Sequence, residues 1–167
     1  MENKYAFLMI NYDTPDFIKK LQNKIDKKDI CDNNPMHIGI ENETHVTLVP
    51  CLDNDVDLDK IKEMLMPLNK YEIILTDISC FKNKDYDVLK CNAFSNNLLE
   101  TNKLITSKFD IHTEFKDYTP HLTIAYLNKG TAEKYIKNNL NDVVLLKPKY
   151  FKFSYYENDE EKYKIFY

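Results

Sequence analysis

The sequence predicts a single α+β domain built from two copies of one structural unit. Segments with strand-like alternation and segments with helical spacing of apolar side chains follow each other along the whole chain. The order strand, helix, strand, helix occurs twice, and in each copy the second strand carries a His-x-Thr tripeptide. With 167 residues and 43% hydrophobic residues, the chain can bury one compact core. We therefore expect residues 1–167 to form one domain with two pseudo-symmetric lobes.

We expect the first copy to contain a strand over 4–11, a helix that starts at Thr14-Pro15, a strand over 43–50 and a helix over 55–66. Thr14 is a suitable N-cap and Pro15 fits the first helical position. Pro50 is expected to end the second strand. Residues 37–40 are compatible with a further short strand.

The second copy is expected to contain strands over 71–81, 86–94 and 121–127 and helices over 97–109 and 131–140, the last capped by Thr131. A long strand over 143–156 and its hairpin partner over 161–167 complete the chain, because aromatic residues alternate along both. A pseudo-twofold arrangement of the copies would bring their equivalent strands together at the centre.

The charge balance argues against a tight grip on long nucleic acid. The chain has 27 acidic residues and 23 basic ones, all of them lysine, for a net charge of −4. Domains that bind long RNA or DNA are usually basic, because counterion release at phosphates drives their binding. A small nucleotide remains compatible with this composition, and its phosphate would have to be recognised by lysine, hydroxyl and backbone N–H groups.

Other features of the composition favour a cytoplasmic protein, which we expect to be a monomer. The four cysteines show no C-x-x-C spacing and are expected to be reduced thiols. The first residues read as a strand rather than a signal peptide. No apolar run approaches the ~20 residues of a membrane span, so we expect no membrane partner.

The residues that point to chemistry are the tripeptides His45-Val46-Thr47 and His121-Leu122-Thr123. On a strand, alternate side chains lie on opposite faces. The histidine and threonine of each tripeptide therefore share one face, and the apolar residue between them faces a core. Two such strands side by side would present two imidazoles and two hydroxyl groups to one another.

This set of groups suits the cleavage of a phosphodiester. The reaction needs one proton removed from the attacking oxygen and one delivered to the leaving oxygen, and imidazole does both near neutral pH. Threonine hydroxyl groups can hold the non-bridging phosphate oxygens. Such a site needs no metal or cofactor, and its rate should follow a bell-shaped pH profile.

The two motifs resemble those of the 2H phosphoesterases, which include the 2′-5′ RNA ligase-like (LigT-like) proteins. The similarity is strongest over Tyr118–Ala125 and weaker over Thr44–Val49. It implies a two-lobed α+β fold with antiparallel sheets lining a central cleft, and metal-independent cleavage of 2′,3′-cyclic phosphates, 2′-5′ linkages or cyclic nucleotides. It also implies that His45 and His121 are the acid–base pair and that Thr47 and Thr123 bind phosphate, without deciding which histidine is the base. The absence of arginine departs from many RNA-processing relatives.

Four aromatic residues are candidates for stacking on a base, although core packing is their commoner use: Tyr126, Phe151, Tyr155 and Tyr156. Lys149 and Lys152 are candidates for contact with phosphate. His37 and His112 are expected at the surface or at strand edges. A zinc site from His45, His112, His121 and a cysteine is the weaker alternative, because no short ligand spacing supports it.

The expected function is metal-independent cleavage of a small 2′-linked nucleotide. The candidates are 2′-5′ oligoadenylate and a 2′-5′-containing cyclic dinucleotide such as 2′,3′-cGAMP. The chain is rich in Lys, Asn, Ile, Tyr and Phe and has two Gly, no Arg and no Trp, which is typical of an AT-rich genome. If that genome is viral, such an activity would blunt nucleotide-based immune signalling. The alternatives are an RNA 2′,3′-cyclic phosphate phosphodiesterase, a module that sequesters a nucleotide without cleaving it, and a structural domain in which the two histidines are not neighbours.

Overall fold

The computed structural model describes residues 5–32, 39–113, 117–137, 140–158 and 160–167. Within these residues, one antiparallel sheet has the strand order β6-β3-β4-β5-β2-β1-β7-β8. Its strands are β1 (Tyr5–Tyr12), β2 (His45–Asp53), β3 (Ile73–Lys82), β4 (Tyr86–Phe94), β5 (His121–Asn128), β6 (Val144–Leu146), β7 (Pro148–Glu157) and β8 (Glu160–Phe166). The helices are α1 (Asp16–Gln22), α2 (Leu58–Met64) and α3 (Asn96–Thr106), and three 3₁₀ turns are η1 (Lys27–Asp29), η2 (Leu68–Lys70) and η3 (Ala132–Tyr135).

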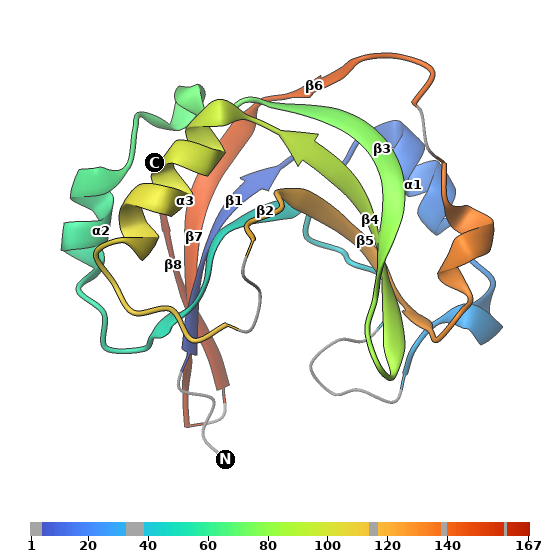
Figure 1. Ribbon diagram of the computed structural model, residues 1–167, viewed down its shortest axis with the longest axis horizontal. Helices are drawn as coiled ribbons and strands as arrows, with labels where there is room; N and C mark the ends of the chain where they lie inside the picture. Colours follow the sequence, from blue (N-terminus) through green and yellow to red (C-terminus); the bar gives the residue numbers. More distant parts are fainter. Residues whose placement is uncertain (1–4, 33–38, 114–116, 138–139, 159) are drawn as a thin grey trace.

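The sheet consists of two halves that meet at the strands with the His-x-Thr motifs. Strands β2, β1, β7 and β8 form the His45 lobe, and strands β5, β4, β3 and β6 form the His121 lobe. The two lobes are joined through one residue pair, Val46 with Leu122, between antiparallel strands. The sheet bends into an arch around this junction (Figure 1). The predicted two-lobed α+β fold is confirmed, with a single continuous sheet.

Each lobe receives a helix from the other. Helix α1 follows β1 of the His45 lobe but packs against β5, whereas α3 follows β4 of the His121 lobe and packs against β2. Helix α2 then packs beside α3, and η3 packs against β3 and β4. Figure 1 shows α2 and α3 beside one lobe and α1 beside the other. This reciprocal exchange is what a duplicated strand–helix–strand unit produces.

Both central strands contain a bulge at the same place in the motif. In β2, Thr47 pairs with Met9 and Val49 with Leu8, which leaves Leu48 as the extra residue. In β5, Ile124 is the extra residue between the paired positions on either side. As a result, two successive side chains are buried in each strand instead of alternating. A bulge bends its strand and redirects the side chains that follow.

The crossover helices bind the backbone carbonyls of these bulges. Asn102 of α3 donates its Nδ2–H to the Leu48 carbonyl at 2.7 Å. Gln22 of α1 donates its Nε2–H to the Ile124 carbonyl at 3.1 Å. A bulge interrupts the ladder, and buried carbonyls need a hydrogen-bond donor. The side-chain amides of Asn102 and Gln22 therefore stabilise equivalent bulges in the two lobes.

The predicted helix over 131–140 is wrong. The described residues form only the short turn η3, after which Lys137 pairs with Ile78 of β3 through two backbone hydrogen bonds of 2.8 and 3.1 Å. Pairing with the sheet edge thus replaces the helical hydrogen bonds. The Thr131 hydroxyl does not cap a helix and instead donates to the Asn128 carbonyl at 2.7 Å.

The predicted strand over 143–156 is divided into two strands, which lie in different lobes of the sheet. Strand β6 pairs with β3, and β7, which begins at Pro148, pairs with β1 and β8. Pro50 does not end β2, which continues to Asp53 with Cys51 at a positive φ of 53°. The residue at the N-cap of α1 is Pro15, and the Thr14 hydroxyl bonds that of Thr44 at 2.7 Å.

Residues 37–38 of the predicted short strand lie outside the described residues, and Ile40 forms a bridge with Ala125. None of the described helices is long and apolar enough to cross a membrane. All four cysteines are free thiols.

Replacing Asn102 by alanine should lower the free energy of unfolding by about 1–3 kcal/mol, because the buried Leu48 carbonyl loses its side-chain donor. Urea denaturation measures this change. The matched control is Asn96→Ala, at an exposed position on the same helix, which should change the free energy by less than about 0.5 kcal/mol. Equal effects of the two substitutions would contradict a role for Asn102 at the bulge.

Candidate active site

The structure brings the two His-x-Thr motifs together on one face of the sheet. Val46 and Leu122, the pair that joins the lobes, are fully buried and belong to the core that the helices cover. The flanking side chains of His45, Thr47, His121 and Thr123 are half-buried and lie on the opposite face, here called the site face. The two imidazoles are thus diagonal neighbours across an antiparallel pair, a relationship that typically separates residues by about 7–8 Å.

The two imidazole rings are held in the same way. The Nδ1 atom of His45 lies 2.7 Å from the carbonyl oxygen of Glu43, and that of His121 lies 2.7 Å from the carbonyl oxygen of Thr119. A carbonyl oxygen only accepts hydrogen bonds, so Nδ1–H is the donor in both rings. Nε2 is then the atom that takes up or releases a proton, and it does so in a fixed orientation.

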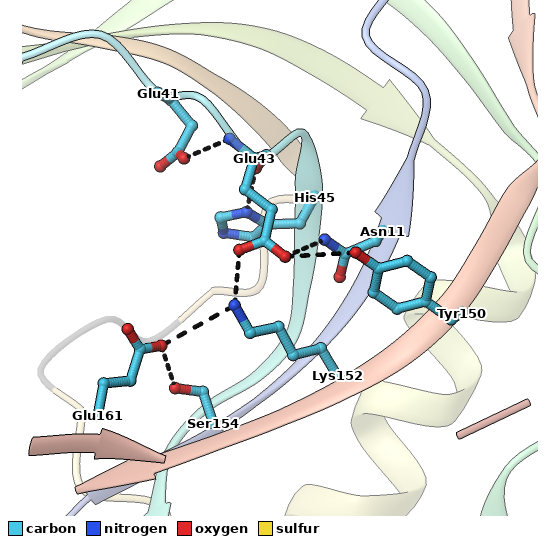
Figure 2. Close-up of polar contacts among 8 residues, drawn as sticks. All are labelled: Asn11, Glu41, Glu43, His45, Tyr150, Lys152, Ser154 and Glu161. Atoms are coloured by element: carbon cyan, nitrogen blue, oxygen red, sulfur yellow. Dashed lines mark hydrogen bonds and ion pairs between the residues drawn. The ribbon is translucent and has the colours of Figure 1, made fainter. Parts of the chain in front are cut away.

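A network of charged and polar side chains surrounds His45 (Figure 2). Asn11 of β1 is the direct partner of His45 in the sheet and donates Nδ2–H to the Glu43 carboxylate at 2.8 Å. Lys152 of β7 donates to the other carboxylate oxygen at 2.6 Å, and Tyr150 donates to the first at 3.5 Å. Glu43, in the segment just before β2, is therefore bonded to side chains of both β1 and β7.

The charges of Glu43 and Lys152 offset each other. Burial opposes ionisation of Glu43, but the hydrogen bond and charge of Lys152, together with His45, hold the pKa of this carboxyl below its ordinary value. Burial also opposes the charge of Lys152, whose pKa is nevertheless raised by Glu43. At neutral pH the pair is ionised and adds little net charge beside His45.

His121 has a different electrostatic environment. The Phe81 ring and the His121 imidazole pack in a T-shaped arrangement, with ring centroids 4.9 Å apart and planes at 86°. Burial, and to a smaller extent the positive charges of Lys90 and His45, lower the pKa of His121 to about 4, although its bond to Thr119 opposes the shift. His121 is therefore neutral at pH 7, with a lone pair on Nε2.

Equivalent asparagines accompany the two histidines. Asn11 pairs with His45 in the sheet, and Asn92 of β4 pairs with His121. The Asn92 amide donates to both oxygens of Asp77 at 3.1 and 3.0 Å, as Asn11 donates to a carboxylate in the other lobe. The pseudo-symmetry of the backbone thus extends to the side chains behind each imidazole.

The four stacking candidates divide between the two faces of the sheet. The bulge at Ile124 places Tyr126 on the site face, where its side chain forms a hydrogen bond with Thr123. Tyr156 follows the same side of β7 as Lys152, near the hairpin end. Phe151 is 2% exposed and packs between Tyr71 and Phe166.

Tyr155 also lies on the helix side of the sheet, where it lines a surface pocket with Phe153 and α2. Phe151 and Tyr155 are thus used for packing, as their alternation with Phe153 would have indicated.

The remaining candidates lie away from the two motifs or outside the described chain. Lys149 pairs with Asp13 at the surface at 2.8 Å. His112 is partly exposed, bonds Asp53 at 2.9 Å and stacks on Tyr5. His37 is not among the described residues. In the described part of the chain, no three His, Cys, Asp or Glu side chains form a group suited to a metal ion.

Sequence reasoning did not select several residues of the site face: Asn11, Glu43, Ser79, Phe81, Lys90 and Asn92. One signal was present, because Lys90 and Asn92 lie two residues apart in a strand otherwise rich in apolar residues. Period-two spacing puts them on one face. The partner strand and the register, which decide whether that face meets a motif, are not visible in the sequence.

A model of one protein family covers most of the chain. Residues 41–153 match the model of the family described as the 2′-5′ RNA ligase superfamily. No sequence among the curated proteins matches the chain.

Solved structures share the fold at low sequence identity. Escherichia coli LigT complexed with 3′-AMP is 15% identical, with a TM-score of 0.55 over 99% of this chain and 96% of LigT. The protein TT0787 of Thermus thermophilus is 16% identical, with a TM-score of 0.56 over 96% of this chain and 94% of TT0787. LigT complexed with NADP+ is 17% identical, with a TM-score of 0.51 over 100% and 96% of the two chains.

The matched residues include both His-x-Thr motifs and also Lys90, Asn92 and Lys152. Because the match spans most of the chain and the fold agrees over its whole length, this protein belongs to the 2′-5′ RNA ligase superfamily of 2H phosphoesterases.

Proposed function

We propose that this protein is a metal-independent phosphodiesterase in which His45 and His121 are the acid–base pair and Thr47 and Thr123 bind the phosphate. The observation that carries the proposal is the single residue pair between β2 and β5, which sets both motifs side by side on the site face. Family membership supports phosphodiesterase-type chemistry. A phosphate between the two strands would meet an imidazole and a hydroxyl group from each.

The lowered pKa of His121 favours this residue as the base. A general base must be unprotonated when substrate binds, and His121 meets this condition at neutral pH. His45 is then the acid, and its fixed Nδ1–H bond directs Nε2–H toward the leaving group. The pseudo-symmetric backbone thus supports two different proton-transfer roles.

For a 2′-5′ linkage the reaction is an internal transesterification. His121 removes the proton of the 3′-hydroxyl group, whose oxygen attacks phosphorus and forms a new P–O bond. The P–O bond to the 5′-oxygen breaks, and His45 gives that oxygen its proton. The products are a 2′,3′-cyclic phosphate and a free 5′-hydroxyl group. The threonine hydroxyl groups donate hydrogen bonds to the non-bridging oxygens, where negative charge is concentrated.

We further propose that the substrate is a small 2′-linked nucleotide, such as 2′-5′ oligoadenylate or a 2′-5′-containing cyclic dinucleotide, and that cleaving it weakens immune signalling by such nucleotides. The net charge of −4 and the absence of arginine do not suit long nucleic acid. LigT, which shares the fold, is known in complex with 3′-AMP and with NADP+. A cytoplasmic site of action fits the four free thiols.

Incubation with a substrate panel in the presence of EDTA tests both proposals. The panel contains 2′-5′ oligoadenylate, mixed-linkage and 3′-5′ cyclic dinucleotides, and 2′,3′-cyclic AMP. We expect the wild-type protein to cleave the 2′-5′-linked members. The His45→Ala and His121→Ala variants should each lose about 10²–10⁴-fold in rate, because each loses one proton-transfer step.

His112→Ala is the matched control, since His112 bonds Asp53 away from the motifs, and it should retain wild-type activity. Full activity in the His45→Ala/His121→Ala double variant would refute the mechanism. Cleavage of 2′,3′-cyclic AMP alone would reassign the protein to opening RNA cyclic phosphate ends. Tight binding without any cleavage would indicate a sequestering module.

The pH dependence of kcat/KM should show an acid limb near pH 4. Below the pKa of His121, which is about 4, the base is protonated in the free enzyme and the rate falls; above that pKa it is neutral and active. NMR titration of the His121 ring should give the same midpoint. The His45→Ala variant should raise it, because one positive charge beside His121 is removed. A His121 midpoint at or above 6.5 would contradict its assignment as the base.

A further inference from the structure

Lys90 is a buried lysine on the site face. It lies in β4, is 4% exposed, and pairs directly with Thr123 of β5. Directly paired residues in a sheet point to the same side, so the Lys90 side chain shares the face of Thr123. Lysine is almost never fully buried without a partner, and burying an ammonium group is costly. Its position therefore calls for an explanation.

The ammonium group of Lys90 has only neutral acceptors within reach. It donates to Ser79 Oγ at 2.8 Å and to Asn92 Oδ1, and it lies over the Phe81 ring, 4.4 Å from the centroid. Among the described residues its hydrogen bonds go to Ser79 and Asn92 and to no carboxylate, and the Asn92 amide that bonds Asp77 lies between the ammonium group and that carboxylate. An ammonium group has three donors, so one N–H is left for a further acceptor.

Three observations place this cation beside the proposed catalytic groups. Lys90 is the sheet partner of Thr123, and Asn92, which holds its ammonium group, is the partner of His121. The Phe81 ring contacts both the Lys90 ammonium group and the His121 imidazole. The charge of Lys90 also contributes to the low pKa of His121, after the larger effect of burial.

The other lobe has no equivalent free cation among its described residues. The position that corresponds to Lys90 is Met9, the sheet partner of Thr47. The buried lysine of that lobe, Lys152, comes from the next strand and is neutralised by Glu43 at 2.6 Å. The positive charge at the site face is therefore concentrated on the side of His121 and Thr123.

We propose that Lys90 is a substrate-binding residue whose ammonium group donates a hydrogen bond to a phosphate oxygen of the bound phosphodiester, beside Thr123. This inference rests on the proposed function. In a chain without arginine, Lys90 would supply the positive charge that binds the phosphate. A phosphate oxygen offers the anionic acceptor that Ser79 and Asn92 do not, and it offsets the cost of the buried charge. The ligand class is a phosphate ester with at least one non-bridging oxygen free to reach β4.

The test compares phosphate-dependent binding in Lys90→Met and wild-type protein. Methionine keeps the apolar stem of lysine and removes the charge. Isothermal titration calorimetry should show that Lys90→Met weakens binding of adenosine 3′-monophosphate about 10- to 100-fold. This is the usual loss of affinity when a hydrogen bond to a charged group is removed. Binding of adenosine, which has no phosphate, should not change. Lys149→Met, the same substitution at a surface ion pair, should leave both affinities at wild-type values.

Unchanged affinity for the nucleotide in folded Lys90→Met protein, or equal weakening of nucleotide and adenosine binding, would overturn the proposal. So would a wild-type protein that binds neither adenosine 3′-monophosphate nor inorganic phosphate. If Lys90→Met does not fold, the NMR signals of the Lys90 ε-methylene group in wild-type protein decide. They should shift on addition of inorganic phosphate, and their constancy would refute the contact.

The two proposals fail in different ways. Phosphate-dependent binding that requires Lys90, without cleavage of any substrate, would refute the catalytic function and retain the binding role. Cleavage by wild-type protein with kcat and KM unaffected by Lys90→Met would refute the binding role alone. A purely structural Lys90 would lower the urea midpoint without a selective effect on phosphate, and that result also counts against the proposal.

Discussion

The arrangement of the site depends on how β2 and β5 meet. The strands share one residue pair, and a bulge follows the His-x-Thr motif in each. Each bulge carbonyl is bound by an amide from the helix that the opposite lobe contributes, Asn102 for Leu48 and Gln22 for Ile124. Because these bonds cross between lobes, neither motif strand can shift without disturbing the helix of its counterpart. The spacing of the two imidazoles is thus fixed by the same contacts that hold the lobes together.

On this nearly symmetric backbone the electrostatics are asymmetric. Glu43 and Lys152 neutralise each other beside His45, whereas Lys90 has neutral acceptors beside His121. Phosphodiester cleavage moves one proton onto the enzyme and another off it, so two groups in identical environments would compete for the same role. The difference between the lobes separates the roles. Burial, with a smaller contribution from the charge of Lys90, lowers the pKa of His121 and keeps it unprotonated, and the same charge attracts an anionic substrate to the His121 side.

The sequence was sufficient for the fold class, the duplication and the two motifs, because His-x-Thr recurs at equivalent positions of a repeated element order. It did not predict the bulges at Leu48 and Ile124, since a bulge is defined by the partner strand. For the same reason the sequence alone does not identify Lys90 and Asn92 as residues of the site face, and the stacking candidates Phe151 and Tyr155 pack on the helix side of the sheet. Local propensity predicts a helix after Thr131, but it does not include the backbone pairing of Lys137 with Ile78, which replaces the helical hydrogen bonds.

A buried lysine also bears on which phosphate esters this chain could accept. The net charge is −4 and no arginine is present, so the surface as a whole offers little attraction to a long polyanion. The Lys90 ammonium group, which lies over the Phe81 ring, acts at short range in a medium of lower dielectric constant. There, a single hydrogen bond to phosphate is worth more than at the surface. A small ester that fits between the motif strands gains this contact. A long nucleic acid would gain it at one phosphate only, while its remaining phosphates would lie against a surface that is negative on balance.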